Sequence, residues 1–327
     1  MENSKIAWTH HTFNPWVGCT KVGPGCENCY AKTLDGRHLH SAIDHWGPGA
    51  PREIASETNW QKPTKWDRRA GAKGIRARVF CASMADVFDK EAPCAARERL
   101  WKLIRSTPNL DWLILTKRPE KIQEYLPQDW GSAGYTNVWL GTTCEDRKHG
   151  FPRVDALRAI PAKVHFVSCE PLLEDISDIN LSNISWLITG GESGRKARAF
   201  DVAWARALRE LCAKSNVRFF VKQMGARPIE CGSPLKFHKT TEGKRDIDGR
   251  SMDNFPADLR IQEFPSTGST EIDETFEDEV PEEALDAILN WLQKYDREDS
   301  ILTHLAECAI ASITGLILAN SEFYPRQ

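Results

Sequence analysis

Three cysteines stand close together near the start of the chain, at Cys19, Cys26 and Cys29, with the spacing C-x6-C-x2-C. Three thiolates can hold three irons of a [4Fe–4S] cluster and leave the fourth iron open for another ligand. A closed zinc site requires four ligands, and the sequence places no fourth ligand close by. The surrounding residues favour a tight loop with little side-chain bulk, because they include Gly18, Gly23, Pro24 and Gly25. The pattern therefore indicates a metal-binding loop with one open coordination position.

The remaining cysteines among the ten in the chain are scattered along it. Residues 1–12 contain no apolar signal-peptide core, which predicts a cytoplasmic, reducing location. In such a location a cysteine cluster indicates metal binding before disulfides. A different class of protein is also compatible with the cysteines: a nucleic-acid-binding protein in which they hold a structural zinc with a distant fourth ligand, His38 or Cys81.

Charge is unevenly distributed along the 327 residues, whose formal net charge is −3. Residues 266–327 carry 14 acidic and 3 basic residues, a net of −11, and residues 1–265 carry 40 basic and 32 acidic residues, a net of +8. A basic body fits an anionic partner such as nucleic acid, and it fits an ordinary solvated surface about equally well.

Short apolar runs rich in β-branched and aromatic residues recur along the chain and are typical of strands buried on both faces. They span residues 78–82, 112–115, 138–140, 164–167, 186–188 and 219–221. Helix-like stretches lie between them, among them 95–105 and 201–215, the latter with Asp201 as its N-cap. Strands that alternate with helices predict a parallel sheet or barrel.

With a further strand expected at 14–18, leading into the cysteine loop, the chain has six or seven strands. A closed barrel of this type needs eight. The predicted fold class is therefore α/β: a partial (β/α) TIM-type barrel of about six parallel strands, with a C-terminal helical extension. Residues 46–76 are rich in tryptophan and proline, and we expect a long irregular loop over one face.

The barrel is expected to occupy residues 1–225. Residues 226–265 are rich in turn residues and are predicted to form an irregular extension packed on the barrel. Residues 266–327 are predicted to form an acidic linker and a two-helix tail, with helices at 281–295 and 299–320. The apolar stretch 308–319 is shorter than a membrane span, so we expect no membrane partner.

Polar residues follow each expected strand. In a barrel of parallel strands, chemistry collects at the carboxyl ends of the strands, so these residues are predicted to line one site. The residues concerned are Ser83 and Asp86, Lys117 and Arg118, Thr142 to Glu145, Ser168 to Glu170, Gly190 to Gly194, and Lys222 and Gln223. The glycines at 190 and 191 would let backbone N–H groups approach a ligand, and they are equally compatible with a tight turn.

Other candidates are weaker. His38, His40 and His45 have no supporting acid or cysteine at metal spacing, which favours ordinary surface or core histidines. Cys144 and Cys169 follow strands and have two interpretations: a hydrogen-atom donor or additional cluster ligand, or a small buried apolar side chain, which is the commoner role of a free cysteine.

A three-cysteine loop at the start of a partial barrel resembles the radical S-adenosylmethionine superfamily. In those enzymes a [4Fe–4S] cluster binds S-adenosylmethionine at its open iron and cleaves it to a 5′-deoxyadenosyl radical, which abstracts hydrogen. The usual spacing is C-x3-C-x2-C, with an aromatic residue before the last cysteine. This chain departs from it in the six-residue first gap and in Tyr30, which follows Cys29.

Several ordered motifs between residues 4 and 265 are more closely similar to the phage-associated three-Cys-motif family. They are NPWVGC at 14–19, CENCY at 26–30, LTKRP at 115–119, EPLL at 170–173, GGESG at 190–194, FFVKQ at 219–223, DGR at 248–250 and FP at 255–256. The resemblance implies an enzyme whose cofactors are a [4Fe–4S] cluster on Cys19, Cys26 and Cys29 and S-adenosylmethionine, with an electron donor as a partner. It implies that S-adenosylmethionine lies across the strand ends, on some of Ser83, Asp86, Lys117, Glu170, Gly190, Gly191 and Glu192.

The expected substrate is a nucleobase in DNA or RNA. The basic body, the tryptophans and arginines of residues 46–78 and the phage association that the resemblance implies all favour it. A protein or small-molecule substrate remains open. A phage structural or interaction protein is a third class, against which the polar strand ends argue. The acidic tail is expected to dock a protein partner or to cover the basic face.

Overall fold

The computed structural model describes residues 1–38, 43–240 and 243–266. These residues belong to one compact unit, Met1–Glu271. The predicted linker after Ser266 and the predicted helices at 281–295 and 299–320 lie outside the described residues.

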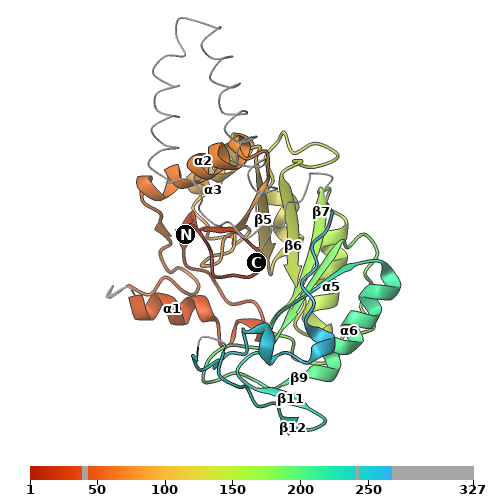
Figure 1. Ribbon diagram of the computed structural model, residues 1–327. Helices are drawn as coiled ribbons and strands as arrows, with labels where there is room; N and C mark the ends of the chain where they lie inside the picture. Colours follow the sequence, from red (N-terminus) through yellow and green to blue (C-terminus); the bar gives the residue numbers. More distant parts are fainter. Residues whose placement is uncertain (39–42, 241–242, 267–327) are drawn as a thin grey trace, which may run out of the picture. The chain divides into compact units, whose positions relative to one another are not determined.

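A parallel sheet of seven strands forms a curled half-barrel, which confirms the predicted fold class. The strands are adjacent in the order β1-β4-β5-β6-β7-β8-β10, and every neighbouring pair is parallel. Figure 1 shows β5, β6 and β7 side by side in this sheet. Their bounds are β1 His11–Phe13, β4 Ala77–Cys81, β5 Leu110–Thr116, β6 Val138–Thr143, β7 Val164–Cys169, β8 Trp186–Gly190 and β10 Arg218–Gln223. Because all strands run the same way, their carboxyl ends meet at one edge.

The described helices are α1 Tyr30–His38, α2 Glu57–Ala72, α3 Cys94–Arg105, α4 Ile122–Tyr125, α5 Arg147–Arg158 and α6 Val202–Ser215. The helices α3 and α6 confirm the expectations for 95–105 and 201–215. Asp201 is the N-cap of α6, as predicted, because its carboxylate accepts a 2.9 Å hydrogen bond from the Ala203 N–H.

The two faces of the sheet carry different cores. One cluster packs strand residues such as Val79 and Ile114 against the helices α2, α3, α5 and α6. The second cluster consists of strand residues and Trp8, and six of its nine members are aromatic: Trp8, Phe80, Trp139, Phe166, Trp186 and Phe220. Side chains alternate between faces along a strand, so this second cluster is the filling of the half-barrel interior.

The first strand was expected at 14–18, and this position was wrong. Residues His11–Phe13 form β1 and pair with β4, whereas β2 (Trp16–Val17) pairs antiparallel with β3 (Glu53–Ile54) in a separate ribbon. Pro15 lies between the two and has no N–H to donate to a sheet ladder, which explains why the strand of the main sheet ends before it.

The expectation of an irregular loop over 46–76 was also wrong, because α2 occupies Glu57–Ala72 within it. The Ser56 side chain caps the helix by accepting from the Asn59 N–H at 3.4 Å. The helix buries Trp60, Pro63, Trp66, Asp67 and Ala70, spaced at three or four residues, which is the periodicity of one helical face. Pro63 and the tryptophans hid this pattern, since proline inside a helix is uncommon.

Residues 226–266 contain the short strands β11 (Pro228–Glu230) and β12 (Ser233–Pro234), which form a small sheet with β9 (Phe200–Asp201). The segment continues along the main sheet, where the Trp186 indole N–H donates to the Glu263 carbonyl at 2.8 Å. Across the described ranges, no helix has the length and apolar character of a membrane span.

Candidate functional site

The cysteine loop, residues 18–30, lies over the carboxyl ends of four strands of the sheet. The Gly18 N–H donates to the Met84 carbonyl after β4, at 3.0 Å. Further along, the loop contacts Arg118 after β5, Glu145 after β6 and Glu192 after β8. The sequence prediction that strand-end residues gather around one place therefore fits the positions of these side chains.

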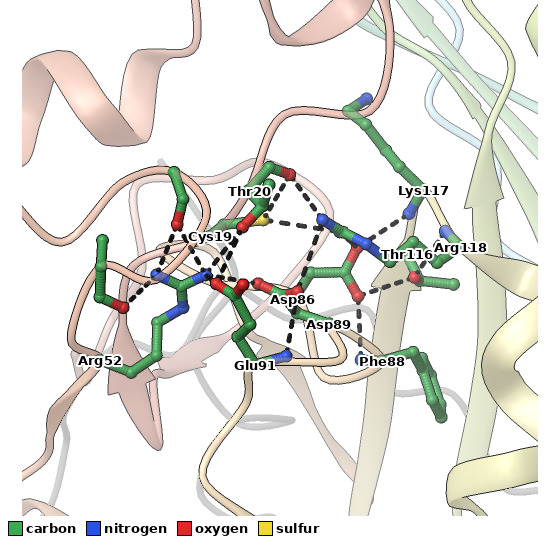
Figure 2. A network of polar contacts seen from close by, with 12 residues as sticks. Cys19, Thr20, Arg52, Asp86, Phe88, Asp89, Glu91, Thr116, Lys117 and Arg118 are labelled. Atoms are coloured by element: carbon green, nitrogen blue, oxygen red, sulfur yellow. Dashed lines mark hydrogen bonds and ion pairs between the residues drawn. The ribbon is translucent and has the colours of Figure 1, made fainter.

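At its first cysteine, the loop is held by Arg118 (Figure 2). The guanidinium donates to the Asp86 carboxylate at 2.8 Å, to the Thr20 carbonyl at 2.5 Å and to the Cys19 sulfur at 3.6 Å. Asp86 also accepts from the Thr116 hydroxyl at 2.7 Å and from the Lys117 N–H at 3.1 Å. Asp86 therefore holds the end of β5 and the side chain that reaches Cys19.

A second buried arginine, Arg52, contacts the same loop at Thr20, on the side opposite to Arg118 (Figure 2). It donates to the Thr20 hydroxyl at 2.9 Å and pairs with Asp89 at 2.9 Å and with Glu91 at 3.0 Å. Its side chain is 2% exposed. The loop between β4 and α3 carries the carboxylates Asp86, Asp89 and Glu91. These carboxylates hold the two arginines that contact the loop around Cys19.

In the middle of the loop, Gly25 passes directly against Glu145. A Cβ atom at Gly25 would stand 2.2 Å from a carboxylate oxygen of Glu145, so only glycine fits there. Glu145 is 1% exposed and pairs with Lys117, whose ammonium also donates to the Thr143 hydroxyl at 3.1 Å, and with Arg153 at 2.7 Å. Burial alone would raise the pKa of Glu145, but the two cations lower it below its ordinary value.

At the far end of the loop, Glu192 and Arg198 hold the segment around Cys26 and Cys29. The Arg198 guanidinium donates to Glu192 at 2.6 Å and to the Pro24 carbonyl at 3.0 Å. The Asn28 side chain donates to Glu192 at 3.1 Å. Burial acts to raise the pKa of Glu192, and the Arg198 hydrogen bonds outweigh it, so this pKa is lowered.

The other predicted cofactor-binding residues lie at the same edge of the sheet. This edge, formed by the residues that follow the carboxyl ends of the strands, is called the rim below. Glu170, after β7, accepts from the Lys222 ammonium at 2.7 and 2.8 Å, across the intervening strand β8. The Ser83 hydroxyl contacts the Asn14 side chain at 3.1 Å, and the Ser83 carbonyl accepts from the Tyr30 hydroxyl at 2.7 Å. Tyr30 is 49% exposed.

The two glycines at the end of β8 are explained by close packing. A Cβ atom at Gly191 would stand 2.3 Å from the Met224 carbonyl oxygen, and one at Gly190 would stand 3.0 Å from the Gln223 carbonyl oxygen. The Gln223 amide donates to the Gly191 carbonyl at 2.9 Å. The end of β8 therefore needs glycine because the end of β10 lies against it, whether or not a ligand binds.

The protonation of Cys19 bears on what it can bind. Burial, and then the Asp86 carboxylate, raise the pKa of its thiol to about 12, although Arg118 acts in the opposite direction. Cys19 without a metal is therefore a neutral thiol at pH 7, and a metal must displace its proton to bind.

The three cysteines share one loop but do not form a closed metal geometry. Within the described ranges, no three His, Cys, Asp or Glu side chains are arranged to hold a metal ion. Cys26 is buried, and Cys19 and Cys29 are half-buried, all as free thiols. As a donor set, three thiolates with no fourth protein ligand beside them fit an iron–sulfur cluster with an open iron.

The weaker candidates whose side chains are described are buried. Cys81, Cys144 and Cys169 are each 0% exposed and belong to the core on the helix side of the sheet. His45 is buried, with its Nδ1 atom 3.2 Å from an Asp35 carboxylate oxygen. The side chains of His38 and His40 are outside the described part of the chain.

Residues that the sequence prediction missed hold the loop rather than line the rim. Arg153 and Arg198 follow no strand and belong to no spaced pattern, and Asn28 lies between Cys26 and Cys29 in a motif that predicts no role for its side chain. Arg198 also had a signal, because it follows the Gly190–Gly194 turn within a basic run, Arg195-Lys196-Ala197-Arg198. Trp60 and Trp66 belong to the tryptophans whose presence in residues 46–78 favours a nucleobase substrate, but they are 3% and 2% exposed and pack in the core.

The fold and the loop define a class: a curled parallel α/β half-barrel with a cysteine loop over the carboxyl ends of its strands. Residues 3–256 match a protein family described as "Protein of unknown function (DUF5131)". The chain belongs to this family. A comparison of the chain with curated proteins found no match.

Among solved structures, the chain is similar to spore photoproduct lyase. A mutant with bound AdoMet and dinucleoside spore photoproduct has 11% sequence identity and a TM-score of 0.41, with 65% of this chain and 64% of that chain covered. A complex with dinucleoside spore photoproduct has 12% identity and a TM-score of 0.40, with coverage of 65% and 63%. Another mutant has 10% identity and a TM-score of 0.43, with coverage of 67% and 78%. The chain thus spans 64% of the length of the first of these structures.

Proposed function

We propose that this protein is an iron–sulfur enzyme of the radical S-adenosylmethionine type. Cys19, Cys26 and Cys29 would hold a [4Fe–4S] cluster, whose open iron would bind S-adenosylmethionine and, on reduction, supply the 5′-deoxyadenosyl radical. The observation that carries the proposal is the position of the cysteine loop, which lies over the strand ends of a half-barrel and contacts the residues that follow β4, β5, β6 and β8.

The residues of the rim would orient the cofactor and substrate. Lys222 and Lys117 are cations whose side chains are each 21% exposed, and each is paired with a carboxylate. A ligand carboxylate could exchange with Glu170 at Lys222, because such a pair is only partly desolvated. Asp86 and Glu192 are already occupied by Arg118 and Arg198, so we assign them to holding the cysteine loop.

Anaerobic reconstitution with iron and sulfide tests the proposal. The wild type should take up about four irons and four sulfides per chain, as a [4Fe–4S] cluster requires. Replacement of any one of Cys19, Cys26 and Cys29 by Ser should abolish this uptake. Cys231→Ser is the matched control, because Cys231 is an exposed cysteine in the turn between β11 and β12, and it should load fully.

The loaded wild type, given S-adenosylmethionine and a low-potential reductant, should produce 5′-deoxyadenosine. A loaded protein that never cleaves the cofactor would contradict the proposal. So would one equivalent of zinc in a colourless protein prepared without oxygen, which supports the alternative of a nucleic-acid-binding protein with a structural zinc.

For the substrate, we propose a nucleobase in DNA or RNA. The support is the net charge of +8 on residues 1–265. Trp60 and Trp66 are buried, so base stacking would have to come from exposed rings, and Tyr30 at the rim is one. Phage association, an electron donor and a protein partner of the acidic tail remain predictions from the sequence.

Binding of single-stranded DNA and RNA, measured at 50 and 200 mM salt, tests the substrate class. Contact with several phosphates predicts a steep fall of affinity with salt, by roughly 10³-fold for six contacts. Heparin is the control for a general attraction to polyanions and should bind less tightly than the oligonucleotides. Equal binding of heparin, or no binding at low salt, would contradict a nucleic-acid substrate. Removal of residues 266–327 should strengthen binding if the tail covers the basic face.

A further inference from the structure

Arg118 is the only cation in the described part of the chain that an observed hydrogen bond joins to the sulfur of a loop cysteine. Its Nη1 atom lies 3.6 Å from the Cys19 sulfur and 2.8 Å from an Asp86 oxygen, and its Nη2 atom donates to the Thr20 carbonyl. The side chain is 8% exposed. A buried, planar guanidinium with three fixed acceptors has one orientation, so its contact with the sulfur is built into the fold.

The contact with the sulfur is made in addition to the contacts of Arg118 with Asp86 and Thr20. Asp86 and Asp89 already receive hydrogen bonds from other donors, among them Thr116 and Arg52. Arg118 supplies the cation for Asp86 and a donor to the Thr20 carbonyl, and among the described contacts it is also the one nitrogen donor to the Cys19 sulfur.

We propose that Arg118 is a positioning residue that fixes Cys19 and, through its hydrogen bond to the sulfur, sets the reduction potential of the cluster. This inference rests on the proposed function. One-electron reduction adds a negative charge to the cluster, and donors to its sulfurs stabilise the reduced form. Arg118 therefore makes the cluster easier to reduce, while Asp86 holds the guanidinium in place and moderates its charge.

The chain contains a matched control. Arg52 is as buried as Arg118, pairs with the same Asp89 and donates to the same Thr20, but through the hydroxyl and not beside the sulfur. Arg118→Gln and Arg52→Gln each remove one buried positive charge from this region. Only the first removes the donor to the Cys19 sulfur.

The experiment is a redox titration of the reconstituted protein without S-adenosylmethionine, followed by electron paramagnetic resonance of the reduced cluster. Iron and sulfide are counted first for every variant. Arg118→Gln should shift the midpoint to more negative potential by about 59 mV or more, a tenfold loss of reduced cluster at fixed potential for one electron. Arg52→Gln should shift it by much less. Asp86→Asn, which removes the nearer of the two carboxylates paired with the guanidinium, should shift the midpoint in the positive direction.

Equal shifts in the Arg118 and Arg52 variants, or none in a fully loaded Arg118→Gln, would overturn the inference alone. If Arg118→Gln takes up no cluster, Arg118→Lys decides, because an ammonium keeps the charge but cannot reach Asp86, Thr20 and the sulfur together. A negative shift in Arg118→Lys supports the inference, and a wild-type midpoint overturns it. A wild type that never binds a cluster overturns the proposed function and this inference together.

Discussion

The two ends of the cysteine loop are held by similar pairs in different surroundings. At Cys19, Arg118 and Asp86 are 8% and 7% exposed, and both belong to a network that includes Arg52 and the end of β5. Near Cys26 and Cys29, Glu192 is 6% exposed but Arg198 is 29% exposed, and its further partner Glu27 is 67% exposed. A buried pair is costly to break, whereas a half-exposed one is screened by water.

This difference indicates how the loop could accommodate a metal. The Cys19 end is fixed by residues of the core, and the Cys26–Cys29 end is fixed by a loop and a half-exposed arginine. Since no three potential ligands are gathered within the described residues, a cluster requires the thiols to approach one another. We expect the movement to come from the Cys26–Cys29 end, where fewer buried contacts must be broken.

The largest effect is expected from Arg118→Met, which leaves Asp86 buried without its cation. Loss of one partner of a buried ion pair typically costs about 3 kcal/mol of unfolding free energy. Urea unfolding of the metal-free protein measures it. Because Asp86→Asn removes the orphaned charge, the double variant should recover part of the loss. A loss below about 1 kcal/mol, the range of exposed pairs, would remove the distinction between the two ends.

A smaller effect is expected in the middle of the loop, from Gly25→Ala. The new methyl group would meet the Glu145 carboxylate, which Lys117 and Arg153 hold in place, so the loop must shift. Overpacking of this kind costs about 1–3 kcal/mol. Gly36→Ala in α1 is the control, since a Cβ atom there meets nothing within 4 Å. The control should be neutral or slightly stabilising; equal losses in both variants would mean that contact with Glu145 is not the cause.

At the exposed end, Arg198→Gln should cost about 1 kcal/mol, because the pair is half-exposed and Asn28 still donates to Glu192. The same unfolding measurement applies. Glu27→Gln, which removes the exposed partner 3.4 Å from Arg198, should change stability by less than about 0.5 kcal/mol. A loss for Arg198→Gln as large as that for Arg118→Met would show that the loop is equally fixed at both ends.

The fold was largely predictable from the sequence, and the contrast between the two ends was not. The apolar runs around Leu113, Leu140 and Ile188 identified strands because a short run of β-branched and aromatic residues is a local signal of a buried strand. The helix α2 was missed because it contains Pro63, which is uncommon inside helices, and the proline- and tryptophan-rich composition is typical of a loop. The strand rule predicts Asp86, Lys117, Glu170 and Glu192 at one edge of the sheet, and in the structure these residues follow β4, β5, β7 and β8.

The pairing of those residues depends on long-range geometry. Arg198 donates to a carbonyl 174 residues earlier, at Pro24, and Arg118 reaches a cysteine 99 residues earlier. No spacing in the sequence encodes such contacts, because the curvature of the sheet brings the partners together. The same geometry explains the six-residue gap between Cys19 and Cys26. The two ends of the gap contact residues that follow different strands, and Gly25 passes against the Glu145 side chain between them.

The smallest expected effect is the loss, at acidic pH, of the stability that the Glu192–Arg198 pair contributes. The pKa of Glu192 is lowered from 4.5, so its pair with Arg198 contributes stability above that value and loses it as the pH falls through the lowered pKa. The melting temperatures of the wild type and of Glu192→Gln should therefore differ by a constant amount from pH 8 to about pH 5 and converge below about pH 4.5. Thermal melts across this range measure the difference. Glu145 is present in both proteins, so its own lowered pKa cancels. A gap that widens in acid would contradict a lowered pKa and would leave the exposed end of the loop held by hydrogen bonds without charge.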